Sequence, residues 1–417
     1  MGLGYKEDEP QPSAADRLME AVLWHWEQLG SASTSTRSLC RVANVQMASL
    51  YHHFDNLERL YAETQSLASD RAETWCQARL DGLAGVSLPP AAIGPFLADL
   101  IDDWCMDQRQ LVFARRECGL LAARQERFRP ILAQWNHVWE RFWSQAMEHF
   151  GLGEYAAITG HFFLGQSIIH IMPWRRSFDR ATLHEACVGW AAWLCGDPVP
   201  PSPWFDLARS QAEGGLVLPE LTGDIPQRIA SAAAVIVETQ GVGCLTHRAV
   251  AAEAGISLGV VSHRFRTVAD LLAAAFETIY QRMIRHKASL PDIADPNLDA
   301  LSLRLTEGTL GGPSLGMGND ELLLACARRP SLKPFTAQLR YMRGRSGMRY
   351  LQMLAGPNHS PRPIDAFIFS TFMMGLIGTY GTMADRDARI THALPDIRRV
   401  STLFARSLLT CPFKREG

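Results

Sequence analysis

The sequence predicts an all-α protein in which a small head and a larger helical body occur twice in tandem. The chain has 417 residues, and a single hydrophobic core stops growing at roughly 250–300 residues, so at least two domains are expected. A gap-free internal register links 17–60 to 228–271 and pairs Gly30 with Gly241 and Phe54 with Phe265. Elsewhere apolar residues recur at i, i+3 and i+4, and no segment alternates convincingly as a strand would.

Proline marks the boundary between the two halves. The run 196–203 contains four prolines, each of which lacks an N–H donor and restricts the residue before it. The predicted segments are a first head at 13–62, a first regulatory and dimerisation body at 63–195, a linker at 196–225, a second head at 226–273 and a second body at 274–412.

The bodies read as long amphipathic helices. The clearest helical patterns cover 91–106, 128–150, 155–172, 181–194, 332–354, 364–383 and 397–409.

Each head shows the pattern of a helix-turn-helix unit. In the first head a helix at 14–29 precedes a second at 36–43, the turn residue Asn44 and a short third helix at 47–53. The second head repeats this with 247–254, Gly255 and 258–264. Asn and Gly tolerate the left-handed backbone that a tight turn needs, and a short last helix can enter a major groove while its apolar side packs on the head.

These residues resemble the tetracycline-repressor-like (TetR) family of transcriptional regulators. The run TRSLCRVANV at 36–45 followed by SLYHHF at 49–54 is similar to that family's pattern T-x-R-x-L-A-x-x-A-G-V and L-Y-x-H-F, and THRAVAAEAGISLG at 246–259 is closer still. The motif occurs twice in one register but is confined to the heads. The bodies match the family only in helical pattern and length. In this family the last two helices of the body form a four-helix dimer interface, so the resemblance implies that 155–172, 181–194, 364–383 and 397–409 pack on each other and join the halves as a pseudo-dimer within one chain.

The resemblance implies roles for the exposed head positions. Base edges would be faced by Arg37, Met47, Ala48, Ser49 and Tyr51 in the first head and by Arg248, Leu258, Gly259, Val260 and Ser262 in the second. Phosphates would be contacted by Thr36, Tyr51, His53, Thr246 and Arg264. Arginine suits guanine edges and hydroxyls suit phosphate oxygens, whereas Phe54 and Phe265 read as core residues of the heads.

The two heads differ in charge. Leu57 and Val268 stand where the family usually has a lysine, so each head lacks one phosphate anchor. Asp55 and Glu58 follow the third helix of the first head, whereas Arg264 and Arg266 occupy this region of the second. We therefore expect the second head to bind the DNA backbone more strongly, and the two heads to read an imperfect palindrome.

The first body is the candidate for a ligand pocket. All eleven tryptophans lie between Trp24 and Trp204, whereas the second body relies on Met and Phe, so two different cavities, or one cavity and one packed body, are expected. Bodies of the resembled family bind a small molecule, which implies a small-molecule effector here, apolar or aromatic in character. The candidate pocket residues are Trp135, Trp139, His161, Gln166 and His170, although the tryptophans also suit a packed core or interface and the histidines suit buried hydrogen bonds.

The sequence thus favours a sequence-specific DNA-binding transcriptional regulator that acts as a ligand-responsive repressor. No cofactor or metal is expected. Further pairing of two chains into a homodimer is compatible with the pseudo-dimer. The nine cysteines include no C-x-x-C pair, residues 1–12 are polar, and no run of about 18 apolar residues appears, so a cytoplasmic protein with no membrane partner is expected. Motifs of hydrolases, zinc peptidases and phosphate-binding loops are absent, which argues against an enzyme. The alternative is a TetR-like ligand-binding or interaction protein in which one or both heads no longer bind DNA.

Overall fold

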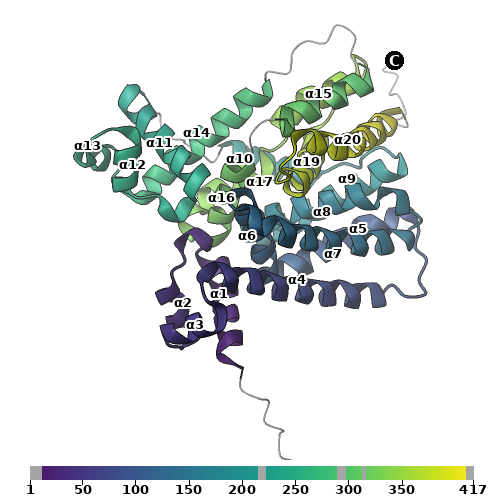
Figure 1. The fold of residues 1–417 in the computed structure, drawn as a ribbon. Helices are drawn as coiled ribbons and strands as arrows, with labels where there is room; N and C mark the ends of the chain where they lie inside the picture. Colours follow the sequence, from purple (N-terminus) through teal and green to yellow (C-terminus); the bar gives the residue numbers. More distant parts are fainter. Residues whose placement is uncertain (1–11, 215–221, 289–296, 312–315, 410–417) are drawn as a thin grey trace, which may run out of the picture.

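The computed structural model describes residues 12–214, 222–288, 297–311 and 316–409, and in these ranges the chain is helical, with no strand (Figure 1). The all-α prediction is confirmed. The α-helices are α1 Ala14–Gln28, α2 Thr36–Ala43, α3 Met47–Phe54, α4 Leu57–Asp81, α5 Ile93–Met106, α6 Arg109–Arg124, α7 Arg129–Glu148, α8 Ala156–His170, α9 Arg176–Cys195, α10 Pro203–Gly214, α11 Asp224–Gln240, α12 His247–Ala254, α13 Leu258–Arg264, α14 Val268–Ala288, α15 Leu298–Leu310, α16 Gly316–Arg328, α17 Lys333–Tyr341, α18 Arg345–Ala355, α19 Pro363–Tyr380 and α20 Arg386–Leu409. The 3-10 turns are η1 Ser31–Ser33, η2 Pro90–Ala92, η3 Glu126–Phe128, η4 Gly153–Tyr155, η5 Val242–Cys244 and η6 Pro330–Leu332.

The first four helices form a compact corner of the molecule, in which α1 packs against α2, α3 and α4. The Ser35 hydroxyl caps α2 by accepting a hydrogen bond from the Ser38 N–H at 3.2 Å. Asn44 ends α2 with a left-handed backbone at φ 51°, which turns the chain directly into α3. The Arg17 side chain bridges α1 to this turn by donating to the Ala43 carbonyl at 3.2 Å.

The region from α11 to α14 has the same local structure, in the register that pairs 17–60 with 228–271. We call this pairing the repeat register. It relates α2 to α12 at both ends, and η1 to η5 at both ends. Gly255 takes the left-handed turn conformation of Asn44, at φ 62°. Arg228 donates to the Ala254 carbonyl at 2.9 Å and thus repeats the hydrogen bond of Arg17.

The helices of the two bodies also correspond, but in slightly shifted registers. η3 and α7 correspond to η6 and α17, so that Arg129 at the start of α7 aligns with Lys333 at the start of α17. Further along, α8 and α9 correspond to α19 and α20, so that His170 at the end of α8 aligns with Tyr380 at the end of α19. The two halves therefore share one order of helices.

Helices α8 and α19 pack closely where Gly165 meets Gly375. A Cβ at Gly165 would overlap the backbone of Thr371, and a Cβ at Gly375 would overlap the backbone of His161. Both positions therefore need glycine for the helices to touch.

The predicted single helix at 332–354 is wrong. The chain forms α17 and α18 instead, because Gly344 between them has a left-handed backbone at φ 91° that no continuous α-helix contains. Its counterpart, α7, runs unbroken over 129–148.

The predicted linker at 196–225 contains a helix that the sequence analysis did not anticipate. Pro203 occupies the first position of α10, where its missing N–H costs no hydrogen bond, and α10 packs against α9 and α17. The proline-rich segment before it is not helical, as expected, and residues 215–221 lie outside the described ranges.

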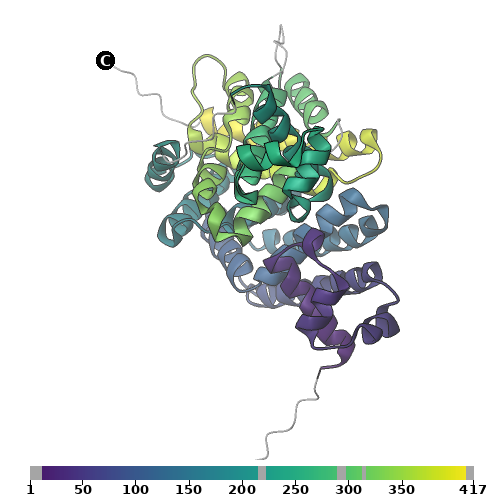
Figure 2. The ribbon, with the colours of Figure 1, turned by 90° about the vertical axis from the view of Figure 1, so that its left-hand side faces the viewer.

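Helix α19 is long and apolar enough to cross a membrane by length and composition. In this structure, however, most of its residues are buried against other helices, above all against α8, as in the core helix of a globular domain. The two regions of short helices, α1–α3 and α11–α13, lie on the same side of the molecule, with the long helices behind them (Figures 1 and 2).

Candidate nucleic-acid interface and ligand pocket

Helices α3 and α13 lie at the outer surface on the side of the molecule that faces the viewer in Figure 2. Each is held from within by a buried apolar residue, Leu50 in α3 and Val261 in α13. Large apolar side chains on their outer faces nevertheless remain exposed: Met47 at 41%, Tyr51 at 48%, Leu258 at 45% and Val260 at 37%. Two large apolar side chains are therefore exposed on the outer face of each helix.

The other predicted contact residues lie on the same two surfaces. Arg37 and His53 in the first region are exposed, as are the remaining predicted residues Ala48, Thr246, Arg248, Gly259, Ser262 and Arg264, whereas Thr36 and Ser49 are half-buried. The counterpart of Thr246 in the structure is Ser35 rather than Thr36. Both cap the helix that follows, since the Thr246 hydroxyl oxygen accepts from the Ala249 N–H at 3.1 Å.

The residues read as core residues are buried. Phe54 and Phe265 both point into their helix clusters, Leu57 is half-buried and Val268 is exposed. The carboxylates beside α3 have cationic partners: Asp55 pairs with Arg59 at 2.6 Å, and Glu58 pairs with the guanidinium of Arg127. Part of the negative charge on the first region is therefore neutralised within the chain.

Two reciprocal ion pairs join α6 to α16, behind these regions. Glu117 in α6 pairs with Arg328 in α16, and Arg124 in α6 pairs with Glu321 in α16 at 2.6 Å. In the register that relates α7 to α17, Glu117 aligns with Glu321 and Arg124 aligns with Arg328, so each pair is the mirror of the other. Burial raises the pKa of Glu321, and the neighbouring Glu117 raises it further.

The same carboxylates hold the two 3-10 turns. Glu117 accepts from the Ser31 N–H at 3.2 Å, and Glu321 accepts from the Val242 N–H at 3.3 Å. Ser31 and Val242 are themselves paired by the repeat register. The turns η1 and η5 also contact each other, since a Cβ at Gly243 would overlap Ser33.

We refer to the four residues Glu117, Arg124, Glu321 and Arg328 as the ion-pair clamp. Each of its carboxylates contacts both an arginine of the other half and the backbone of a 3-10 turn. The clamp therefore fixes the two short-helix regions to each other and to α6 and α16.

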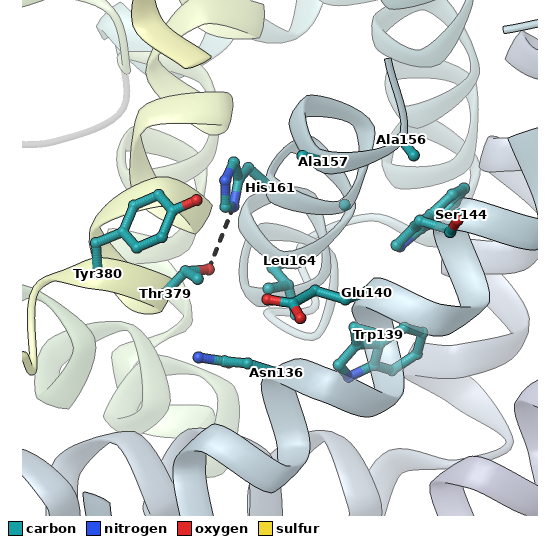
Figure 3. A pocket seen from close by; sticks show the side chains of 12 residues that line it. Asn136, Trp139, Glu140, Ser144, Ala156, Ala157, His161, Leu164, Thr379 and Tyr380 are labelled. Carbon is teal, nitrogen blue, oxygen red and sulfur yellow. Dashed lines mark hydrogen bonds between the residues drawn. The ribbon is translucent and has the colours of Figure 1, made fainter. Parts of the chain in front are cut away.

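A cavity of about 220 Å³ lies between α7, the start of α8 and the end of α19 (Figure 3). Its walls are aromatic or small, from Trp139, Trp143, Tyr380, Ala156, Ala157 and Gly160. Its polar lining residues are Asn136, Glu140, Ser144, His161 and Thr379. Figure 3 shows Thr379 and Tyr380 on one side of the space and Trp139 and Glu140 on the other.

A hydrogen-bonded network supports one wall of this cavity. The two imidazole nitrogens of His161 lie 3.2 Å from the Thr379 hydroxyl and 3.1 Å from the Asp396 carboxylate. The Tyr380 hydroxyl donates to the same carboxylate at 3.1 Å, and burial together with Asp396 raises the pKa of Tyr380 well above its usual value. On the opposite wall, the indole N–H groups of Trp139 and Trp143 are buried without a hydrogen-bond partner.

Of the five predicted pocket residues, Trp139 and His161 line this cavity and the other three lie elsewhere. Trp135 faces α4, where its indole N–H donates to Gln65 at 2.9 Å. Gln166 is buried further along α8. The sequence analysis missed Glu140, Thr379 and Tyr380. Thr379 and Tyr380 come from the other half of the chain, so no pattern within the first body points to them.

His170 belongs to a separate buried cluster. Its Nε2 lies 2.7 Å from the Asp102 carboxylate, which also accepts two hydrogen bonds from Arg176 at 2.6 and 2.7 Å. Burial lowers the pKa of His170. Burial alone would raise the pKa of Asp102, but the hydrogen bonds from His170 and Arg176 outweigh it and lower this pKa well below its usual value.

Among the described residues, no group of three or more His, Cys, Asp or Glu side chains has the geometry to hold a metal ion. Neither protein-family models nor the curated proteins contain a match to this chain.

Proposed function

We propose that this chain is a sequence-specific DNA-binding transcriptional regulator of the TetR type, in which two tandem helix-turn-helix heads and two helical bodies form a pseudo-dimer. One observation carries the proposal. The exposed helices α3 and α13 follow the same capped helix and the same left-handed turn, at positions paired by the repeat register, and both lie on one side of the molecule. A recognition helix needs this exposure and anchoring to enter a major groove.

The join between the halves supports the pseudo-dimer. The crossing of α8 and α19 at Gly165 and Gly375 and the two mirrored pairs of the clamp are contacts of the kind that relate two subunits by a two-fold axis. The heads differ at their outward positions, for example Met47 against Leu258, so the half-sites of the operator should differ too.

The cavity between α7, α8 and α19 supports a ligand-responsive repressor. Because its lining comes from both halves, an occupant bears directly on how they pack and, through the bodies, on how the heads are held. We place the protein in the cytoplasm, which suits the absence of any disulfide among the eight described cysteines.

The proposal is tested by selecting duplexes from a random DNA pool and then footprinting the preferred site at a ratio of one chain to one site. Two protected major-groove segments about one helical turn, or a multiple of it, apart are expected. Arg37→Ala and Arg248→Ala should each relax base preference in a different half-site, whereas Arg304→Ala, at an exposed position on α15, serves as a matched control.

A second candidate function is a ligand-binding or interaction protein whose heads no longer bind DNA. It is favoured by Leu57 and Val268, which supply no phosphate anchor, and by the carboxylates of Asp55 and Glu58 beside α3. Failure of the selection to enrich any sequence would support this candidate, and indifference to Arg37→Ala alone would leave only the second head as a DNA reader.

A further inference from the structure

We propose that the cavity between the halves binds one small aromatic amine per chain, and that the equivalent place in the second half is closed. This inference rests on the proposed function for its regulatory meaning, but ligand binding itself is independent of DNA. The lining supplies three aromatic rings and one exposed carboxylate, and these set the class of ligand.

The charge of the cavity favours a cation. Glu140 supplies the one carboxylate among the described lining residues, and its nearest cationic partner is the imidazole of His137, 3.9 Å away and itself exposed. The other carboxylate nearby, that of Asp396, already accepts from Tyr380 and lies against His161. Glu140 is therefore left to pair with a ligand, and the aromatic faces of the lining add their attraction for an ammonium group.

The volume of the cavity suits a ligand of one or two rings. An apolar cavity of about 150 Å³ holds benzene. The cavity here, at about 220 Å³, has room for a substituted single ring with a short amine-bearing chain.

The equivalent place in the second half is filled. In the register that aligns Arg129 with Lys333, Asn136 corresponds to Arg340. The buried guanidinium of Arg340 donates to the carbonyls of Ile169 and Met172 at 2.7 and 2.8 Å. The second half therefore has a tethered cation at the position where the first half has the amide of Asn136, whose oxygen accepts a hydrogen bond from the buried Arg115 at 2.7 Å.

Glu140 has no carboxylate counterpart. In the same register it corresponds to Gly344, where a Cβ would lie only 2.5 Å from the backbone of Ala366. Ala366 is itself the counterpart of the lining residue Ala156, in the register that aligns the ends of α8 and α19. The backbone at the break between α17 and α18 thus packs against α19 at the place where the first half has the open space beside Glu140. One ligand per chain follows.

Three phenols of nearly equal shape test the proposal by titration calorimetry without DNA. Tyramine carries an ammonium, p-cresol is neutral and 4-hydroxyphenylacetate carries a carboxylate. We expect one equivalent of tyramine per chain, bound at least about threefold more tightly than p-cresol, with the acid weakest. Glu140→Gln should reduce tyramine to the affinity of p-cresol, whereas Glu148→Gln, the same charge change at the far end of α7, should leave the order unchanged.

A blocking variant tests the place and the number of sites. Ser144 is an exposed lining residue, so Ser144→Trp should fill the cavity without disturbing the core and abolish binding while the far-ultraviolet dichroism stays the same. Two equivalents of tyramine, one equivalent retained by Ser144→Trp, an affinity equal to that of p-cresol, or no binding at millimolar concentration would each overturn the inference. None of these outcomes depends on whether the heads bind DNA.

Discussion

Removing Arg328 should expose how much the ion-pair clamp contributes to stability. The side chains of Glu117 and Arg328 are 1% and 5% exposed, and Arg328 also donates to the Trp26 carbonyl at 2.6 and 3.0 Å. Arg328→Leu leaves Glu117 as a buried charge without its cation, a change that costs about 3–5 kcal/mol of unfolding free energy. Part of this loss of free energy comes from lost packing, because the guanidinium of Arg328 lies over the ring of Phe113 at 4.9 Å.

The measurement is urea denaturation followed by circular dichroism, with two further variants. Arg398→Leu breaks an exposed pair with Asp299, whose side chains are 44% and 71% exposed, and should cost only about 0–1 kcal/mol. Adding Glu117→Gln to Arg328→Leu removes the buried charge while keeping an acceptor for the Ser31 N–H, so more than half of the loss should return. If Arg328→Leu costs no more than Arg398→Leu, or if Glu117→Gln restores nothing, the clamp does not act as a buried charge pair.

Three further outcomes follow from the geometry. Gly165→Ala should lower the unfolding free energy by about 1–3 kcal/mol, because the added Cβ would overlap α19. The control Gly308→Ala adds a Cβ that meets nothing within 4 Å, so it should be neutral or stabilising. Equal melting temperatures of the two variants would contradict the close crossing of α8 and α19. The lowered pKa of His170 means that the folded state binds a proton at this imidazole less readily than the unfolded state does, so stability should fall as the pH drops below the unfolded value of 6.5. Thermal melts at about pH 7.5 and about pH 5 should therefore show a smaller loss of stability at the lower pH for His170→Gln than for the unaltered protein. Arg264→Ala should weaken binding to selected and random duplexes alike and reduce the salt dependence of the affinity, whereas Arg248→Ala should relax the preference at one base position. The two variants are compared by binding titrations at two salt concentrations. If both behave alike, these separate roles are wrong.

The local structure of the heads could be predicted because short-range chemistry determines it. The predicted ranges 36–43 and 247–254 match α2 and α12 at both ends. Ser35 and Thr246 each cap the first turn, and Asn44 and Gly255 each take the left-handed conformation that stops the helix. All of these interactions join near neighbours along the chain, so a sequence pattern contains them completely.

The cavity could be predicted only in part because its walls meet through long-range packing. Trp139 was a candidate because tryptophans recur there at i+4 spacing, and His161 because it is a polar residue on an apolar helix. Tyr380 comes within reach only because α19 crosses α8 at Gly165. No periodic pattern states which helices of two similar halves will pair, or at which turn they cross.

The second body shows how one residue can defeat a periodic pattern. The apolar spacing across 332–354 continues through the break, and it therefore predicts one helix. Gly344 interrupts it, and the reason lies in Ala366, whose backbone takes the space that any side chain at 344 would need. Such an approach between distant segments leaves no trace in local composition.

The crossing of α8 and α19 has a further consequence, because both helices belong to one polypeptide. Two separate subunits joined in this way would part on dilution, and related subunits in the same cell could exchange partners. Here neither can happen at this contact, whatever the protein concentration. A substitution on one side of the crossing therefore has to fit only the facing helix of the same chain, as Gly165 and Gly375 fit each other. The sequences of the two halves can diverge without the risk that either half pairs with a wrong partner.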